Sequence, residues 1–208
     1  MKVAVSYINS IYSKTDTIKK IAECPDADAI HIDLMDGKYV RNTNLIDEYL
    51  ISLCNISKPL EVHLMTIKPS DYFPKLLLLN PVCIYIHPET EPDPLLAIKY
   101  LNAQNIEPGI VINPKEAISE YEKYFSSIKR VLLMSVYPGA GGQKFLMSTL
   151  KRLEELKSYQ KHYNFTIYID GGINAETVKL VSLADGVVAG SFICMYPDFQ
   201  KQISKLKN

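Results

Sequence analysis

Cysteine is scarce in this sequence, and its four residues lie far apart in the chain: Cys24, Cys54, Cys83 and Cys194. They form no C-x-x-C pair, so the spacing typical of structural zinc sites is missing. A disulfide framework is also a poor interpretation, because such frameworks belong to small domains dense in cysteine. We therefore predict buried, reduced thiols.

Excess charge and long apolar runs are missing as well. The 23 Lys and Arg residues balance the 23 Asp and Glu residues, so the chain lacks the basic surface typical of proteins that bind nucleic acid or acidic membranes. No run approaches the roughly 20 apolar residues of a membrane span, and the apolar run at the N-terminus is too short for a signal peptide. We expect a cytoplasmic protein, and the zero net charge is compatible with a homo-oligomer.

The length and composition of the sequence indicate one globular domain spanning residues 1–208. The hydrophobic fraction is 47% and the charged fraction is 22%, values at which a chain of this length buries a full core. The sequence contains no low-complexity tract or linker-like segment. Neither G-x-G-x-x-G nor G-x-x-x-x-G-K-[ST] occurs, so the sequence predicts no nucleotide cofactor.

Short apolar runs alternate with amphipathic stretches along the chain. Several runs are continuous, as expected for parallel strands covered on both faces. We predict eight strands, at Val3–Ser6, Ala29–Leu34, Leu60–Met65, Val82–His87, Pro108–Ile112, Arg130–Val136, Thr166–Asp170 and Gly186–Ala189. Helices are predicted at Asp16–Glu23, Pro94–Gln104, Phe145–Gln160 and Ala175–Leu183. Eight strand–helix units favour an α/β fold with a single (β/α)8 TIM barrel. An open sheet stays the alternative, because periodicity does not reveal closure.

Polar side chains end three of these strands. His31 and Asp33 share one face of the second strand at period two, His63 lies on the third, and Asp170 ends the seventh. In a barrel the carboxyl ends of the strands meet at one mouth, where the chemistry of such enzymes is located. Two imidazoles and two carboxylates converging there predict a divalent-metal site. His87, which ends the fourth strand, has either a supporting or a purely structural role.

Glycine-containing turns follow the last three predicted strands. They lie at Pro138–Gln143, Asp170–Gly172 and Ala189–Ser191. Exposed backbone N–H groups in such turns bind anions, and the loops after strands seven and eight usually hold phosphate in this fold. Glycine also permits tight turns without any ligand, but three adjacent turns at one mouth favour a phosphate site.

Together these segments resemble the ribulose-phosphate 3-epimerase family. HIDLMDG (31–37) and EVHLM (61–65) are similar to two of its signatures, and YPGAGGQKF (137–145) is similar to its flexible loop. IDGGI (169–173) and VAGS (188–191) match its last two signatures. Each motif is weak alone, but the ordered set covers nearly the whole chain and is highly specific.

The resemblance implies a site and its ligands. It implies one divalent metal ion, zinc or iron(II) first and manganese or cobalt as alternatives, bound by His31, Asp33, His63 and Asp170. It also implies that Asp33 and Asp170 are the catalytic acid/base pair. The residues implied to bind the substrate are Ser6, His63, Met35, Met65, Met134, Gly139, Gly141, Gly142, Gly172, Gly190 and Ser191. For each methionine, a plain core-filling role is the competing interpretation.

The implied reaction interconverts D-ribulose 5-phosphate and D-xylulose 5-phosphate through a cis-enediolate. Two carboxylates can remove a proton from one face of carbon and return one to the other, provided that their pKa values are pushed apart. A divalent cation would stabilise the charge of the enediolate. Binding energy from the phosphate would position the reacting carbon.

The sequence departs from the family pattern at the barrel mouth. Arg41 replaces the usual proline, Tyr137 replaces asparagine and Ala140 replaces phenylalanine. These departures leave the sugar open, and another 3-epimerase substrate such as D-allulose 6-phosphate is the alternative. A decarboxylase of the D-x-K-x-x-D type is disfavoured, because Met35 stands where its lysine is required. A non-catalytic sugar-phosphate-binding barrel would have no need of both acids.

Overall fold

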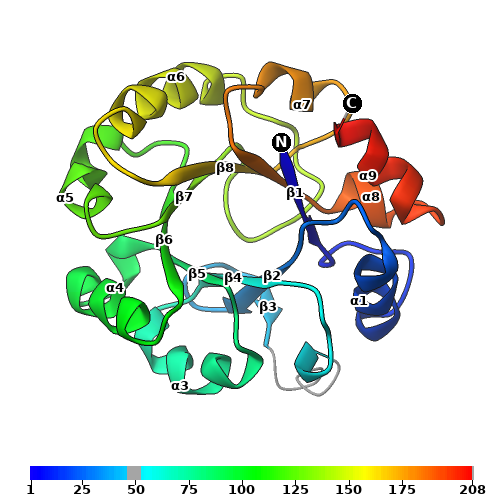
Figure 1. Cartoon of the computed structure of the whole chain (residues 1–208), viewed down its shortest axis with the longest axis horizontal. Coiled ribbons are helices and arrows are strands. Elements are labelled where there is room, and N and C mark those ends of the chain that lie inside the picture. The colour runs from blue at the N-terminus through cyan, green and yellow to red at the C-terminus, as the bar shows by residue number, and fades with distance from the viewer. Residues whose placement is uncertain (46–52, 208) are drawn as a thin grey trace.

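The computed structural model describes residues 1–45 and 53–207, and its centre is a closed ring of eight parallel strands (Figure 1). The ring follows the order β1-β9-β8-β7-β6-β5-β4-β2, and β1 also pairs with β2. The strands are β1 (Lys2–Ser6), β2 (Ala29–Asp36), β4 (Leu60–Met65), β5 (Cys83–Ile86), β6 (Glu107–Ile112), β7 (Arg130–Met134), β8 (Thr166–Asp170) and β9 (Gly186–Ala189). The pairing of β1 with β2 excludes the open sheet and confirms the predicted TIM barrel.

The eight predicted strands are all present, and their burial explains why the sequence revealed them. β2 and β4 are buried along almost their whole length, as their continuous apolar character requires when helices cover one face and the barrel interior covers the other. A ninth strand, β3 (Thr43–Asn44), pairs antiparallel with β2. The turn between them is shaped by Asp36, whose Oδ1 accepts hydrogen bonds from the backbone N–H groups of Lys38 and Tyr39.

Helices surround the barrel in Figure 1. They are α1 (Lys14–Glu23), α3 (Phe73–Leu76), α4 (Pro94–Ala103), α5 (Glu122–Phe125), α6 (Thr149–Gln160), α7 (Thr177–Leu180), α8 (Ser191–Cys194) and α9 (Phe199–Lys207). Short 3-10 turns occur at Pro69–Tyr72, Leu77–Leu79, Pro88–Thr90 and Ile118–Tyr121. Side-chain caps fix the starts of α1 and α4: Ser13 Oγ accepts from the N–H of Asp16, and Asp93 Oδ1 accepts from that of Leu96. The start of α4 at Pro94 was predicted, whereas α1 begins at Lys14, two residues before the predicted Asp16.

Two helix predictions were too long. The segment expected to begin at Phe145 becomes helical only at Thr149, because Phe145 belongs to a loop that lines the barrel mouth. The helix expected over Ala175–Leu183 is the single turn α7. It ends at Leu180, because the backbone of Val181 leaves the helical region.

The core has two layers, one between strands and helices and a smaller one inside the barrel. Inside the barrel, the rings of Tyr85 and Tyr168 pack against the backbone of Gly109 and Gly186. A Cβ on Gly109 would lie 2.3 Å from the nearest atom of the Tyr85 ring, and one on Gly186 would lie 2.4 Å from the nearest atom of the Tyr168 ring. These positions therefore accept glycine alone without displacing a buried tyrosine.

The cysteines are all free, as predicted, and Cys24, Cys83 and Cys194 are buried. Cys54 is exposed, so the expectation of burial was wrong for this residue. Cys54 lies in a short helical turn, in which the preceding residue, Leu53, is buried and Cys54 is on the exposed side.

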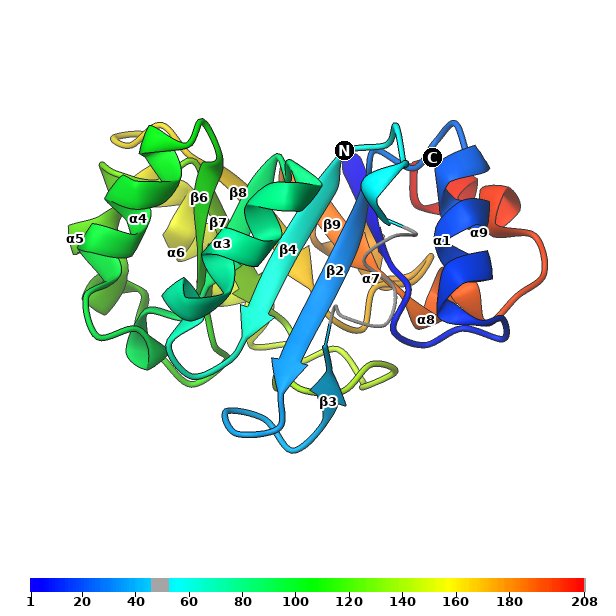
Figure 2. The ribbon, with the colours of Figure 1, turned by 90° about the horizontal axis from the view of Figure 1, so that it is seen from below.

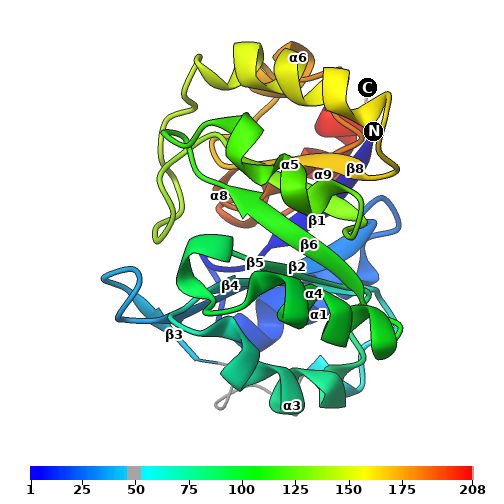
Figure 3. The ribbon, with the colours of Figure 1, turned by 90° about the vertical axis from the view of Figure 1, so that its left-hand side faces the viewer.

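Two insertions project from the same end of the barrel, where the strands finish. Figures 2 and 3 show the β3 hairpin and the loop between β7 and α6 at this end. Asn42 Nδ2 joins them by donating a hydrogen bond of 2.7 Å to the Gly139 carbonyl. Among the described helices, none is long and apolar enough to cross a membrane.

Candidate active site

Four side chains meet where β2, β4 and β8 end. Asp33 and His63 are register partners on neighbouring strands, His31 lies two residues before Asp33, and Asp170 closes β8. Their ligand atoms all lie within 4.8 Å of one another. His63 Nδ1 is 3.1 Å from Asp33 Oδ1 and 3.6 Å from Asp170 Oδ2. The structure thus brings together the four residues that the sequence singled out.

The chemistry of this cluster fits a divalent metal ion. His31 Nε2 is buried without a hydrogen-bond partner in the described structure, and it lies 3.6 Å from Asp33 Oδ1. An orphaned buried nitrogen is costly unless it binds something. The other ring nitrogen, Nδ1, lies 3.4 Å from Glu61 Oε2, an arrangement that orients histidine ligands in metalloproteins. A mixed set of nitrogen and oxygen donors suits zinc, iron(II) and manganese.

The two carboxyls of the cluster have opposite electrostatic environments. Burial raises the pKa of Asp33, but the neighbouring His31 and His63 outweigh it and hold that pKa well below its ordinary value. Burial, with the charge of Asp33, raises the pKa of Asp170 to about 7. Below pH 7 one carboxyl is therefore ionised while the other carries a proton, as an acid/base pair requires.

Hydrogen bonds fix the Asp33 side of the site. Ser6 Oγ donates to Asp33 Oδ2 at 2.6 Å, which places the predicted serine of β1 against the acid. Asn44 Nδ2 donates to the Asp33 carbonyl. Because Asn44 belongs to β3, the hairpin at the mouth also anchors the strand that carries the acid.

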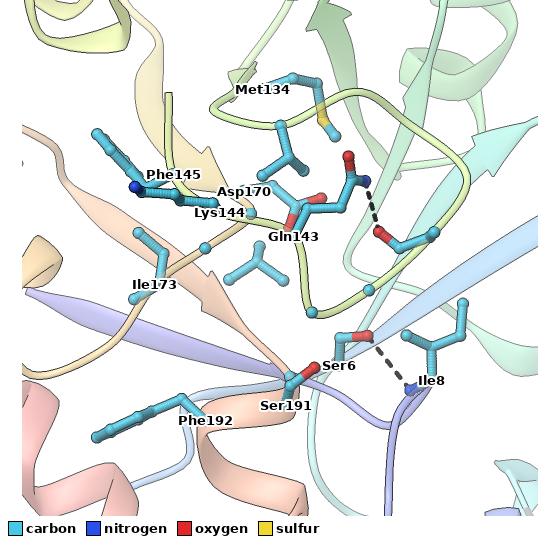
Figure 4. Close-up of a pocket in the computed structure, with 18 of the residues that line it drawn as sticks. Ser6, Ile8, Met134, Gln143, Lys144, Phe145, Asp170, Ile173, Ser191 and Phe192 are labelled. Carbon is cyan, nitrogen blue, oxygen red and sulfur yellow. Dashed lines mark hydrogen bonds between the residues drawn. The ribbon is translucent and has the colours of Figure 1, made fainter. Parts of the chain in front are cut away.

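The cluster opens into a cavity of about 730 Å³ at the mouth. Figure 4 shows Ser6, Met134, Gln143, Asp170 and Ser191 around this cavity. Most of the predicted substrate-binding residues line it: Ser6, His63, Met65, Met134, Gly139, Gly141, Gly142, Gly172, Gly190 and Ser191.

Met35 is the exception among the residues predicted to bind substrate. It is buried and pairs with Met65 across β2 and β4, but it is not among the residues that line the cavity. The period-two phase of β2 was correct, yet Met35 lies beside the antiparallel strand β3, which covers this end of β2. Its contact with substrate therefore remains a prediction.

The glycine turns line one end of the cavity. Gly142 and Gly172 have positive φ values of +75° and +63°, which explains why these turns need glycine. Ser191 Oγ accepts a hydrogen bond of 3.1 Å from Asn9 Nδ2. The same Asn9 side chain packs against Gly141.

Sequence reasoning missed two residues that support this site. Asn9 follows β1 in a loop without periodicity, so nothing in the sequence marked it. Glu61 did carry a signal, because it shares the face of His63 on β4 at period two. Its side chain is buried and bonded to Arg130. His87 contacts His63 directly, with 2.9 Å between the two Nε2 atoms, which favours the supporting role.

Comparison with known proteins identifies the family. Residues 2–194 match the ribulose-phosphate 3 epimerase family. Ribulose-phosphate 3-epimerase of Helicobacter pylori strain J99 is 36% identical, with 100% of this chain and 97% of the relative covered. The Bacillus subtilis enzyme is 34% identical, covering 100% and 98%, and the Escherichia coli K12 enzyme is 31% identical, covering 99% and 94%. The chain belongs to the ribulose-phosphate 3-epimerase family. It is therefore an enzyme, an isomerase that acts on carbohydrates.

Solved structures confirm the fold of this family member. N-(5'-phosphoribosyl)anthranilate isomerase from Pyrococcus furiosus superposes with a TM-score of 0.67 over 99% of this chain and 96% of the other, at 16% identity. Mycobacterium tuberculosis tryptophan synthase gives a TM-score of 0.69 at 13% identity, covering 99% and 91%. At such identities the likeness extends to the barrel alone.

The departures from the family pattern gather around a second cavity of about 640 Å³. Arg41, Tyr137 and Ala140 all line it, and Tyr137 and Ala140 also line the larger cavity. Lys115 Nζ lies 5.5 Å from the centre of the Tyr137 ring. The loop from 137 to 143 therefore forms a wall shared by the two cavities, and its unusual residues face both.

Gly172→Ala is expected to weaken binding of a phosphorylated substrate. The new Cβ would lie 2.6 Å from the backbone nitrogen of Phe145, and an L-residue at positive φ adds strain of about 1–3 kcal/mol. Moving this turn displaces backbone N–H groups of the predicted phosphate site, so KM should rise more than kcat falls. Gly37→Ala is the matched control, since Gly37 has a φ of +72° but lies outside the large cavity. Equal KM values for the two variants would contradict the assignment.

Proposed function

We propose that this family member interconverts D-ribulose 5-phosphate and D-xylulose 5-phosphate, with Asp33 and Asp170 as the acid/base pair. One observation carries the proposal. The two carboxyls lie in one cluster at the mouth of the barrel, and their pKa values are shifted in opposite directions. Epimerisation beside a ketone requires such a pair, one group to take a proton from carbon and one to return a proton to the opposite face.

Different residues of the cavity would contact different parts of the substrate. Gly142, Gly172, Gly190 and Ser191 would hold the phosphate through backbone and hydroxyl donors, which anchors a part of the substrate that does not react. Ser6 orients Asp33 through its hydrogen bond of 2.6 Å. Met65 and Met134 give the reacting carbon an apolar, polarisable wall that keeps water away.

His31, Asp33, His63 and Asp170 would together hold one divalent metal ion. Zinc or iron(II) is the first candidate, and manganese or cobalt is the alternative. When bound, such an ion stabilises the negative charge that develops on the substrate oxygens in the enediolate. The supporting observation is the buried, unpartnered Nε2 of His31. We further propose that the whole chain works as one domain and assembles into a homo-oligomer.

A coupled assay of D-ribulose 5-phosphate conversion tests this proposal. Activity should be lost when a chelator removes the metal and restored by adding back zinc, iron(II), manganese or cobalt, because the four-residue cluster holds the ion. Metal content is measured in parallel by elemental analysis. Full activity in protein shown to be free of metal would overturn the metal assignment while leaving the acid/base pair standing.

D-Allulose 6-phosphate is a second candidate substrate, and one observation favours it. Ala140 stands in the loop that walls the large cavity, where the family usually has phenylalanine, so a longer sugar has more room. Turnover of allulose 6-phosphate with a higher kcat/KM than ribulose 5-phosphate would reassign the substrate. Binding of both sugar phosphates without turnover of either would indicate a non-catalytic barrel.

A further inference from the structure

A chain of hydrogen bonds runs from the back of His63 toward the surface, and the proposed reaction makes no use of it. His63 Nε2 lies 2.9 Å from His87 Nε2, and both residues are completely buried. Their rings stack with centres 5.1 Å apart. One of these two nitrogens must carry the proton of the bond, and the other must accept it.

Beyond His87, this series of hydrogen bonds ends at the carboxylate of Glu89. His87 Nδ1 lies 3.1 Å from the Tyr39 hydroxyl and 3.3 Å from Glu89 Oε1. The Tyr39 hydroxyl donates to Glu89 Oε1 at 2.7 Å, and Asn113 Nδ2 donates to the same oxygen at 2.7 Å. Burial raises the pKa of Glu89, but the contacts with His87 and Tyr39 outweigh it and hold that pKa below its ordinary value. Glu89 is thus a pure acceptor.

Because Glu89 can only accept, it fixes the direction of each hydrogen bond between Glu89 and His63. Tyr39 has one hydroxyl proton, and the 2.7 Å contact with Glu89 requires it there, since two oxygens so close repel without a proton between them. His87 Nδ1 must then be a donor, which leaves its Nε2 as an acceptor. His63 Nε2 is consequently a donor.

The lone pair of His63 is thereby assigned to Nδ1. That atom lies 3.1 Å from Asp33 Oδ1 and 3.6 Å from Asp170 Oδ2, inside the four-residue cluster. Without a proton, Nδ1 and the Asp33 carboxylate are two acceptors in contact, an arrangement that is favourable only when a cation lies between them. If His63 carried its proton on Nδ1 instead, His87 Nδ1 would have to accept the hydroxyl proton of Tyr39. The 2.7 Å contact between Tyr39 and Glu89 would then have no proton. A neutral imidazole binds a metal ion through its unprotonated nitrogen.

We propose that Glu89 and His87 are positioning residues that hold His63 in the Nε2–H tautomer, so that its Nδ1 lone pair faces the metal. The inference rests on the metal site of the proposed function. Glu61 serves His31 in a parallel way through the 3.4 Å contact with Nδ1. The two histidines therefore differ in their support. His31 has the carboxylate of Glu61 as its direct partner, whereas His63 reaches the carboxylate of Glu89 through the second imidazole of His87.

Zinc affinity of the metal-free protein tests the proposal through three variants. Glu89→Gln replaces the pure acceptor by an amide that can also donate, and His87→Phe removes the acceptor for His63. Both should raise the zinc dissociation constant, measured by competition with a chromophoric chelator, by about 10- to 100-fold. His87→Gln should retain most of the affinity, because its amide can accept from His63 and donate to Glu89. Glu120→Gln, at an exposed acid outside the chain of bonds, is the control.

Two further readouts separate positioning from a general structural role. At saturating zinc, kcat of Glu89→Gln should return close to the wild-type value, because the lesion lies in metal affinity. Its metal-free form should unfold at the same urea midpoint as Glu120→Gln, because the Glu89 side chain is one-third exposed. In zinc-loaded wild-type protein, ¹H–¹⁵N correlations should assign the ring proton of His63 to Nε2.

The outcomes also separate this inference from the proposed function. Wild-type zinc affinity in both Glu89→Gln and His87→Phe would overturn the positioning role, while the epimerase and its metal would stand. A His63 proton on Nδ1 would overturn it as well. No zinc binding by the wild-type protein would overturn the metal site and, with it, this inference.

Discussion

Asp170→Asn and Asp33→Asn should each lower kcat by roughly 10²–10⁴-fold, the contribution typical of a positioned acid or base. Asparagine keeps the shape of the side chain but can neither take nor release the proton. Asp170→Asn is the sharper test of the two. Burial and the charge of Asp33 raise the pKa of Asp170 to about 7, whereas the amide of asparagine does not titrate. The coupled assay at saturating zinc measures the loss.

Three controls make this result specific to proton transfer. Elemental analysis verifies that each variant still carries metal, since both residues belong to the proposed ligand set. Urea unfolding verifies that the barrel survives. Asp71→Asn changes an exposed acid whose partner is Lys68 on the surface and should leave kcat unchanged. A wild-type kcat in either Asp33→Asn or Asp170→Asn would contradict the two-carboxylate mechanism.

The second large effect is expected on stability, from Arg130→Met. Arg130 Nη1 donates to Glu61 Oε1, its Nε donates to Glu107 Oε2 at 2.6 Å, and its guanidinium lies 5.1 Å from the centre of the Tyr168 ring. The Glu61 side chain is only 2% exposed. Methionine would fill the space but leave a buried carboxylate without its cation, which costs about 3–5 kcal/mol in the free energy of unfolding.

Urea unfolding of the metal-free protein measures this cost without a contribution from bound metal. Glu107→Gln is the matched control, because the Glu107 side chain is 47% exposed and such pairs contribute about 1 kcal/mol or less. The double variant Glu61→Gln/Arg130→Met should recover much of the loss, since it removes the uncompensated charge. A loss below about 1 kcal/mol in Arg130→Met would contradict the assigned burial of this pair.

The order of the strands and the phase of their polar residues were readable from the sequence. Continuous apolar runs marked the barrel strands, because both faces of a parallel strand are covered. Period-two spacing put His31 and Asp33 on one face, and parallel strands of a barrel end at one mouth. The meeting of these residues with His63 and Asp170 followed from topology, without knowledge of any distance.

Helix lengths at the mouth were less predictable, because local pattern competes with the loops that shape the cavity. Phe145 and Met147 belong to a segment with helical character in sequence, but they line the cavity instead. The single turn of α7 likewise depends on the chain returning at once to β9. In both places tertiary packing overrides the intrinsic preference of the segment.

The sequence by itself determined the eight strand–helix units, the cluster of two histidines and two acids, and the glycine turns, since each depends on periodicity or on chain order. Only the tertiary structure decided that the sheet closes through β1 and β2, that Glu61 faces His31, and that His87 accepts from His63. These contacts join residues 24 to 30 positions apart. No local pattern encodes such a pairing, because it arises when neighbouring strands settle in register and point two buried polar groups at each other.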